Sequence, residues 1–166
     1  MEDWKGADVF VEALSLNKQK KQIDMVYFIG DGDEKKNIQT VASSINDLKI
    51  KFKEFLSRED LNAIYNACHI LILPSKSEGF PKVVAEALSY GCVPVVSNVG
   101  SIDQYINEKN GIILVERTPK YINMAIEKLL SCRTSLKKMA KNGLKTSELF
   151  TYEKYNKRIE SIVLND

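Results

Sequence analysis

Short apolar runs alternate with amphipathic stretches along most of the chain. Short runs bounded by polar residues are typical of strands, and a run that is apolar almost throughout favours a strand covered on both faces. From this pattern we expect five strands, at residues 25–30, 50–55, 69–74, 93–97 and 111–115.

Between and after these runs, apolar residues recur at the three- and four-residue spacing of helices. One such segment starts with Pro81, which is allowed in a first helical turn, and ends at Gly91, a natural C-terminal stop. Another follows Ser57, a suitable N-cap with Asp60 three residues later. We expect helices at residues 7–18, 59–68, 81–91, 118–131, 135–147 and 151–163.

Alternating strands and helices predict right-handed crossovers and a mainly parallel sheet. The expected fold class is therefore α/β, a Rossmann-like three-layer domain with helices on both faces of the sheet. Ligands of such domains bind at the carboxyl ends of the strands. The length of 166 residues fits one domain, and no repeat or low-complexity linker divides it.

Charge and composition exclude some classes of function. The formal net charge of +2, from 24 Lys and Arg against 22 Asp and Glu, gives no case for nucleic-acid binding. We expect neither a transmembrane span nor a signal peptide. Cys68, Cys92 and Cys132 form no CxxC pair, which fits a reducing, cytoplasmic setting with cysteines as small apolar fillers. His69 is the only histidine and opens an apolar run, so we expect a structural residue and no metal site.

The stretch from Leu71 to Ser97, LILPSKSEGFPKVVAEALSYGCVPVVS, contains the candidate site. A helix that begins near Pro81 directs unpaired backbone amides and a partial positive charge toward the strand ends, which suits a diphosphate. Glu78 precedes this helix, and Glu86 lies a little over one turn inside it. Each carboxylate can accept two hydrogen bonds from a vicinal diol, such as that of a ribose or a hexose.

A plainer interpretation stays open at this point. Gly79 would let the backbone approach a ligand closely, but the same residues also suit an ordinary loop. In that case Glu78 would only stabilise the helix dipole, and Glu86 would be a surface residue paired with a neighbour.

The block PSKSEGFPKVVAEALSYGCVPVVSN resembles the signature of the group 1 family of retaining glycosyltransferases, which have the GT-B fold. The shared pattern is Glu-Gly-Phe at residues 78–80, Glu-Ala at 86–87 with seven residues between the two glutamates, and a Gly…Pro-Val-Val run at 91–96. Further segments are similar to the family, so the likeness covers nearly the whole chain: KGADVFVEAL, YFIGDGDE, FLSREDLNAIYNACHILILPS, NGIILV and FTYEKYNKRIESIV.

The resemblance implies that residues 1–166 form the C-terminal, donor-binding lobe of such an enzyme. It implies that Glu86 hydrogen-bonds the ribose and that Glu78 holds hydroxyls of the transferred sugar. Lys5 matches the family lysine that neutralises the departing diphosphate, whose charge grows in the transition state. The sugar and phosphates would face the backbone of the loop and first helical turn, at Gly79, Phe80, Pro81, Lys82 and Val83.

The function implied by this resemblance is transfer of a hexose-type sugar from a nucleoside diphosphate sugar to a glycan or glycolipid acceptor. Retention would follow from front-face attack, with no enzyme nucleophile, no metal and no cofactor beyond the donor substrate. The partner would be an N-terminal acceptor lobe of the same polypeptide, reached by a terminal helix at residues 151–166. Without that lobe we expect weak donor binding and no transfer. The expected location is cytoplasmic, with contact between the full protein and the inner face of a membrane left open.

Three other interpretations are weaker or remain as alternatives. A non-catalytic nucleotide-sugar binding module would show the same motif. A receiver or flavodoxin-like domain would need an acidic cluster after its first strand and a lysine after its last, and the sequence offers neither in order. Sugar-nucleotide epimerases with the GT-B fold lack the two-glutamate pattern in this loop, which counts against that activity for this chain.

The sequence also departs from the family pattern. The family's first strand and an arginine near it have no counterpart, because Met1 lies only four residues before Lys5. That strand would lie between those at 25–30 and 69–74, so its absence would leave a gap of about 10 Å, two strand spacings, which a folded sheet cannot leave empty. Either the neighbouring strands close up, or another segment fills the gap, or the first residues are misaligned. Milder departures are Pro81 and Glu54 in place of glycines and Gln104 in place of a glutamate.

Overall fold

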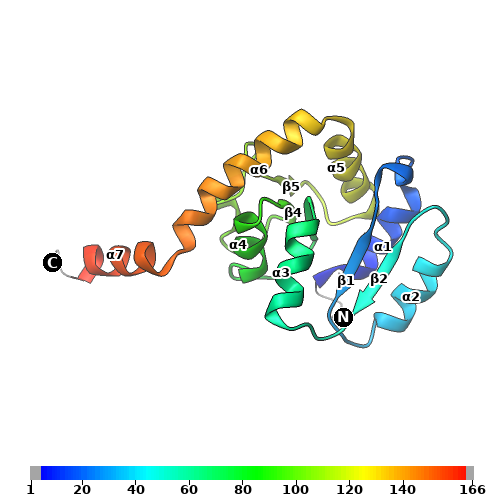
Figure 1. Ribbon diagram of the computed structural model, residues 1–166, viewed down its shortest axis with the longest axis horizontal. Coiled ribbons are helices and arrows are strands. Elements are labelled where there is room, and N and C mark those ends of the chain that lie inside the picture. The colour runs from blue at the N-terminus through cyan, green and yellow to red at the C-terminus, as the bar shows by residue number, and fades with distance from the viewer. Residues whose placement is uncertain (1–4, 164–166) are drawn as a thin grey trace.

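All five predicted strands form, but they are divided between two parallel sheets. The computed structural model describes residues 5–163 (Figure 1). One sheet has the order β1–β2, and the other has the order β3–β4–β5. The strands are β1 (Val26–Ile29), β2 (Ile50–Lys53), β3 (Ile70–Leu73), β4 (Val93–Ser97) and β5 (Ile112–Leu114). The predicted α/β class with parallel strands is confirmed.

The six predicted helices form close to their expected bounds. Ser57 caps the helix at residues 58–67 as predicted, since its Oγ accepts from the backbone N–H of Asp60 at 3.0 Å. Thr118 caps the helix at residues 119–131 in the same way, because its side chain accepts from the amide of Tyr121 at 3.5 Å. The helices are α1 (Ala7–Leu16), α3 (Arg58–Ala67), α4 (Lys82–Ser89), α5 (Pro119–Ser131), α6 (Arg133–Ser147) and α7 (Tyr152–Val163).

One helix, α2 (Lys35–Ser43), was not predicted. Its surface is almost entirely polar, and only Ile38 and Ala42 are buried among its residues. Short 3₁₀ turns also occur, and we label them η2 (Lys20–Gln22), η3 (Ile102–Gln104) and η4 (Glu148–Phe150).

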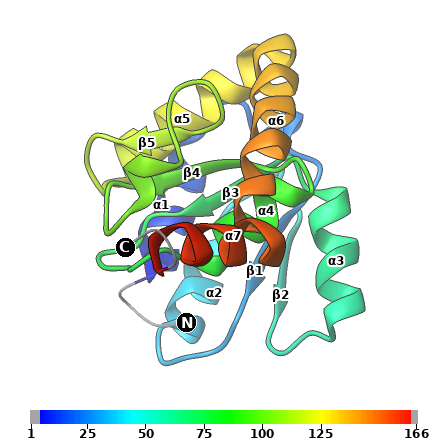
Figure 2. The same ribbon diagram turned by 90° about the vertical axis from the view of Figure 1, so that its left-hand side faces the viewer.

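Helices flank the sheets on both sides (Figure 2). α1 packs against α2 and α5, and α4 packs against α6. One large core includes Val26 and Phe28 of β1 together with Val93 and Val95 of β4, so it extends under both sheets. A second core surrounds Leu88 of α4 on the β3–β4–β5 sheet alone. Burying a large aliphatic side chain contributes about 1.5–3 kcal/mol, so these clusters supply much of the stability.

The terminal segment at residues 151–166 is helical over α7, and its last three residues lie outside the described part. α7 extends away from the rest of the domain in Figure 1. Tyr152 and Ile159 on it are exposed at 84% and 43%. Whether this helix reaches a second lobe stays a prediction.

The space between β1 and β3 is not filled by any strand of the described residues, so the expectation that a folded sheet cannot leave this gap empty is wrong. Neither of these strands pairs with the other, and within residues 5–163 no other strand lies between them. A cavity of about 600 Å³ occupies this place, lined by residues of both strands and of the helices around them. The neighbouring strands therefore do not close up.

Candidate functional site

The candidate site lies where β3 ends and α4 begins. Pro81 is the N-cap of α4, with an extended ψ of 118°, so the helix starts one residue later than predicted, at Lys82. The carbonyl of Pro81 accepts from the amide of Val84 at 2.9 Å. The amides of Lys82 and Val83 have no acceptor within the helix, and no side chain caps it. This end of α4 therefore offers two N–H donors and the positive end of the helix dipole.

Glu78 is held in the loop that leads to this helix end. It is half-buried, and the hydroxyl of the buried Ser75 donates to its Oε1 at 3.1 Å. The loop is fixed from the other side by the segment after β4, because the amide of Ser101 donates to the carbonyl of Gly79 at 2.9 Å. The loop geometry is therefore set by two separate strand ends.

The close contact between this loop and the segment after β4 depends on a glycine. Gly100 has a φ of +59°, and a Cβ added there would lie 1.9 Å from the carbonyl oxygen of Gly79. Only glycine allows that approach. At Gly79 itself an added Cβ would meet nothing within 4 Å, so its Cα faces open space. That openness is compatible with the predicted approach of a ligand to the backbone.

Glu86 lies on α4 and faces α3. It is half-buried, and the phenol of Tyr65 on α3 donates to its Oε2 at 3.4 Å. Burial, and secondly the Glu86 carboxylate, raise the pKa of Tyr65, so this hydroxyl stays protonated and keeps donating. Tyr65 is itself held by a stacked ring, Tyr90, at 5.4 Å between centroids. The carboxylate of Glu86 is thus oriented by a neutral donor instead of a cation.

Phe80 anchors the loop to η4, the turn that follows α6. Its ring stacks on Phe150 of η4 with centroids 4.8 Å apart, and it meets Tyr105 edge-on at 5.1 Å. Aromatic pairs of this kind contribute about 0.5–1.5 kcal/mol beyond their buried area. The predicted backbone role of Phe80 is therefore accompanied by a packing role that the sequence did not indicate.

Lys5 lies at the same edge of the fold, at the start of α1. Its neighbour Gly6 has a φ of +79°, and a Cβ there would be 2.3 Å from the carbonyl oxygen of Pro74, the residue after β3. The start of α1 is therefore pressed against the end of β3. Lys5 is exposed, and this contact brings it to the edge that also carries Glu78.

Arg117 was missed by sequence reasoning. Its Nε donates to the carbonyl of Pro74 at 2.7 Å, and its Nη2 pairs with Asp8 of α1 at 3.2 Å. It follows β5, so the rule that strand ends gather at one edge could have indicated it. Ser97, at the end of β4, has a buried hydroxyl that makes no hydrogen bond with the described residues.

Some predicted residues have a different environment from the expected one. Glu54, which stands in place of a family glycine, is paired with Lys35 of α2, and Lys35 also lies 3.6 Å from Asp31. His69 is exposed and lines the cavity between the sheets. Cys132 is exposed, so its prediction as an apolar filler is wrong.

Cys92 does fit the prediction of a small apolar filler. Burial raises the pKa of its thiol to about 12, and its Sγ donates to the carbonyl of Cys68 at 3.1 Å. Within residues 5–163, no three metal-binding side chains cluster in a way that could hold an ion. None of the described helices is both long and apolar enough to cross a bilayer.

Known proteins match this chain in sequence. The model of the family "Glycosyl transferases group 1" matches residues 1–146. An uncharacterised glycosyltransferase of Methanocaldococcus jannaschii is 27% identical over 152 residues, covering 90% of this chain and 42% of that protein. An N-acetylgalactosaminyltransferase of Campylobacter jejuni, acting on N,N'-diacetylbacillosaminyl-diphospho-undecaprenol, is 28% identical over 97% of this chain and 43% of its own length. The chain thus spans about two fifths of the length of these relatives.

Solved structures match the fold. The catalytic domain of the cholesterol-α-glucosyltransferase of Helicobacter pylori superimposes with a TM-score of 0.79 and 22% identity, over 90% of this chain and 93% of that one. Anabaena HepE, solved with UDP-glucose, gives a TM-score of 0.81 and 19% identity over all of this chain and 47% of its own. The family match covers most of the chain and includes the loop of Glu78 and the helix of Glu86, so this chain belongs to the group 1 glycosyltransferases.

Proposed function

We propose that this chain is the donor-binding domain of a retaining glycosyltransferase. In this proposal a nucleoside diphosphate sugar is the donor, a hexose-type sugar is transferred, and a glycan or glycolipid accepts it. The relatives with printed activities transfer sugars, and HepE binds UDP-glucose, which supports a sugar nucleotide as the donor.

The observation that carries the proposal is the pair of carboxylates beside the start of α4. The hydroxyl of Ser75 donates to one oxygen of Glu78, and the hydroxyl of Tyr65 donates to one oxygen of Glu86. An ionised carboxylate has about four acceptor sites, so each retains capacity for the hydroxyls of a diol. The plainer interpretation makes Glu86 a surface residue paired with a neighbour, and its contact with Tyr65 agrees with that too; what favours a binding role is that Glu86 is half-buried and held in a defined orientation.

The negative charge of the donor would be balanced by the protein itself. The amides of Lys82 and Val83 would face the phosphates, and Gly79, Phe80 and Pro81 would line the path of the sugar. Lys5 would stabilise the diphosphate as it departs, because a fixed cation lowers the energy of that growing charge. No step of this scheme requires a metal or another cofactor.

Transfer itself would require a second lobe. GT-B enzymes react in the cleft between two lobes, and this chain spans 42% and 38% of the first two relatives. We therefore expect the domain alone to bind donor weakly and to release no sugar to an acceptor. The N-terminal lobe of a longer protein would be its partner, with α7 as the crossing helix.

Titration calorimetry with UDP-glucose and GDP-mannose tests the donor site. We expect one of them to bind, and Glu86→Ala to weaken it about 10- to 100-fold, the value of a charged hydrogen bond of about 1.5–3 kcal/mol. Tyr65→Phe keeps the carboxylate but removes its orienting donor, so a loss of only a few-fold is expected, about 1 kcal/mol or less. Glu108→Ala, at an exposed glutamate outside the site, is the matched control.

Equal affinity of the wild-type chain and Glu86→Ala would contradict the ribose role. A non-catalytic module would give the same calorimetry, so catalysis is tested in the longer protein. There, Lys5→Ala should lower the rate of transfer and leave donor binding largely intact. Unchanged transfer would contradict the role of Lys5, whereas no transfer by the longer wild-type protein would favour a binding module.

A further inference from the structure

The helix α6 carries positive charge without any negative charge. Its 15 residues include five basic side chains and neither Asp nor Glu. All five are exposed, and among residues 5–163 none of them forms an ion pair; we call them the basic face of α6: Arg133, Lys137, Lys138, Lys141 and Lys145. Taking them from the 24 Lys and Arg of the chain leaves 19, against 22 Asp and Glu. The small net charge of the whole chain therefore conceals a basic helix on an acidic remainder.

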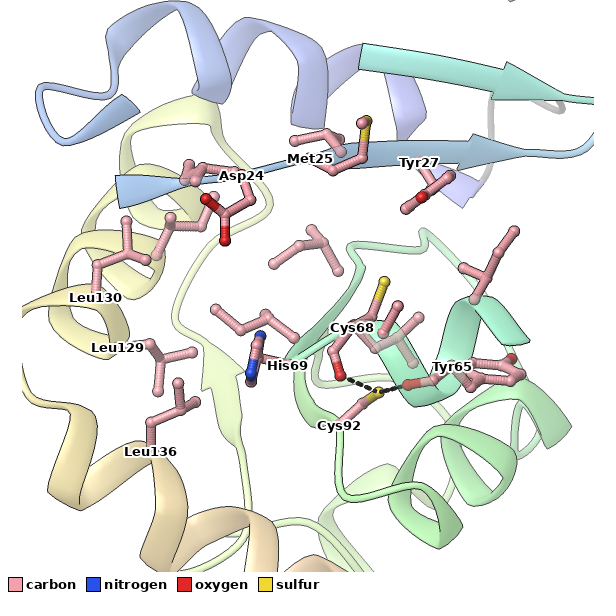
Figure 3. Close-up of a pocket in the computed structure, with 18 of the residues that line it drawn as sticks. Asp24, Met25, Tyr27, Tyr65, Cys68, His69, Cys92, Leu129, Leu130 and Leu136 are labelled. Atoms are coloured by element: carbon pink, nitrogen blue, oxygen red, sulfur yellow. Dashed lines mark hydrogen bonds between the residues drawn. The ribbon is translucent and has the colours of Figure 1, made fainter. Parts of the chain in front are cut away.

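The five charges lie on one side of the helix. Four of them are spaced four residues apart, from Arg133 to Lys145, so they form a stripe about 18 Å long at 1.5 Å per residue. The opposite side of α6 is apolar, since Met139 and Gly143 are buried and Figure 3 shows Leu136 directed into the space between the sheets. α6 runs along the outer edge of the domain in Figures 1 and 2. The basic face is therefore turned away from the rest of the protein.

Exposed helix sides are commonly charged, but two features of this one indicate a partner. Like charges four residues apart on a helix repel each other and destabilise it. α6 contains three such pairs in succession, and the first acidic residue, Glu148, comes only after its last turn. In addition, Leu144 is 44% exposed and lies on the same side, three residues after Lys141 and seven after Lys137. An anionic partner would relieve the repulsion and could cover the leucine.

The chemistry of this face favours a lipid surface over other anions. A single helix at the edge of a domain is convex, so it suits an extended surface better than a small anion, which binds in concave sites. α6 contains no aromatic side chain on which a nucleobase could stack, and the acidic remainder of the chain would repel a long polyanion. Lysines on flexible stems beside an exposed leucine suit lipid headgroups, with the charges at the phosphates and the leucine at the acyl boundary.

The basic face is separate from the proposed donor site. α6 packs against the last turn of α4, since a Cβ added at Gly91 would lie 3.9 Å from Ala140 and from Leu144. The proposed donor site lies at the other end of α4, where the helix begins at Lys82. A bilayer against α6 would therefore leave the start of α4 uncovered.

We propose that the basic face of α6 holds this domain against the surface of a membrane that contains anionic lipids. The attraction is electrostatic, and the cations lie at the level of the lipid phosphates. Each Lys or Arg near such a surface strengthens binding about fivefold, so five of them suffice for reversible attachment. The glycolipid acceptor proposed above would give this contact a use, but the contact depends neither on that acceptor nor on the donor.

Sedimentation with lipid vesicles tests the proposal. The chain is mixed with vesicles of phosphatidylcholine alone and with vesicles that also contain phosphatidylglycerol. We expect binding to the second kind only, and we expect added salt to weaken it because exposed charges are screened. Lys137→Gln combined with Lys141→Gln should lower the affinity for the anionic vesicles by roughly 30-fold, about fivefold for each charge.

Two matched variants separate the charge of α6 from charge in general. Lys51→Gln with Lys53→Gln removes the same charge from exposed positions of β2, so it should bind anionic vesicles nearly as tightly as the wild-type chain. Lys137→Arg with Lys141→Arg keeps the charge on α6 and should also bind like the wild-type chain. All four positions are exposed, so we expect each variant to fold, and the Tm of each is measured as a check.

Four results would overturn the proposal. The chain could fail to bind anionic vesicles, or it could bind both kinds of vesicle equally. The variant of β2 could lose as much affinity as the glutamine variant of α6. Finally, a single-stranded oligonucleotide could bind more tightly than the vesicles and be released by the glutamine variant of α6, which would identify a nucleic acid as the partner. Because the donor is measured by calorimetry without lipid, failure here leaves the test of the donor site intact.

Discussion

The two sheets of this domain differ in how completely they are buried. Every residue of β4 is buried, and the β3–β4–β5 sheet has separate apolar clusters around Leu88 and around Tyr65 in addition to the large shared core. In the β1–β2 sheet Val26 and Phe28 are buried, whereas Lys51 and Lys53 are exposed. One face of this smaller sheet is thus supported by the core and the other is open.

This difference matches the location of the candidate site. Glu78 and Glu86 belong to segments that start from the well-packed sheet, while Lys5 precedes α1, the helix whose buried residues pack in the core shared by the two sheets. A rigid sheet fixes the loop and the start of α4, and the smaller sheet is held mainly through helices. We therefore expect the β1–β2 unit to open locally at lower free energy than the rest.

The largest expected effect is the loss of a core side chain from the well-packed sheet. Leu88 is fully buried, and a Cβ added at Gly143 of α6 would lie 2.8 Å from it, so little space exists for the site to collapse. We expect Leu88→Ala to lower the free energy of unfolding by about 4 kcal/mol, toward the upper end for such changes. Denaturant unfolding followed by circular dichroism measures this.

Ile38→Ala is the matching core substitution near the smaller sheet, because Ile38 lies on α2 and is buried in the core with residues of β1. It should cost about 2–3 kcal/mol and accelerate hydrogen exchange mainly in β1 and β2, whereas Leu88→Ala should accelerate it throughout the core. Uniform acceleration by both variants would show that the domain opens as one unit.

The second effect concerns two glycines with positive φ, one near each sheet. Gly100 touches the loop of Glu78 and Gly79, and an added Cβ would clash with their carbonyl oxygens at 2.2 and 1.9 Å. We expect Gly100→Ala to cost about 3 kcal/mol from strain and overpacking, and to weaken sugar-nucleotide binding because the loop must move. Thermal unfolding and calorimetry measure the two consequences.

Gly30→Ala is the control for backbone strain alone. Gly30 has a φ of +123°, but an added Cβ would meet nothing within 4 Å. It should therefore cost about 1–3 kcal/mol of stability without changing donor affinity. If both variants bind equally well, the contact of Gly100 does not position the loop.

The sequence predicted the larger sheet and the site loop well because their signals are local. Apolar runs mark β3 and β4, and the glutamates of the loop and of α4 lie in one continuous segment. It missed α2 because that helix buries few residues, and it missed Arg117 because Pro74 and Asp8 are far from it along the chain. Contacts of that kind are fixed by the fold and have no local pattern. The gap between β1 and β3 was predictable from strand order, but the persistence of the cavity was not.

The smallest expected effect lies at the carboxyl ends of the strands of the smaller sheet, where Lys35 of α2 pairs with Glu54 after β2 and more distantly with Asp31 after β1. The hydrogen bond from Lys35 to Glu54 raises the pKa of that lysine. A raised pKa in the folded state means that the pair stabilises the protein below the unfolded pKa of lysine, and that this contribution is lost as the pH rises through the folded pKa.

Glu54→Gln should therefore lower the pKa of Lys35 toward its ordinary value and reduce the loss of stability at alkaline pH. Tm at neutral pH should hardly change, because ion pairs in contact with solvent contribute little. Titration of the Lys35 side chain by NMR measures the shift, and Asp31→Asn, which removes the partner at 3.6 Å, should move it less. An equal or larger shift in Asp31→Asn would show that the turn after β1, and not the end of β2, holds this lysine. The two strands of the smaller sheet would then be tied together by their backbone pairing and the core beneath them, without help from this pair.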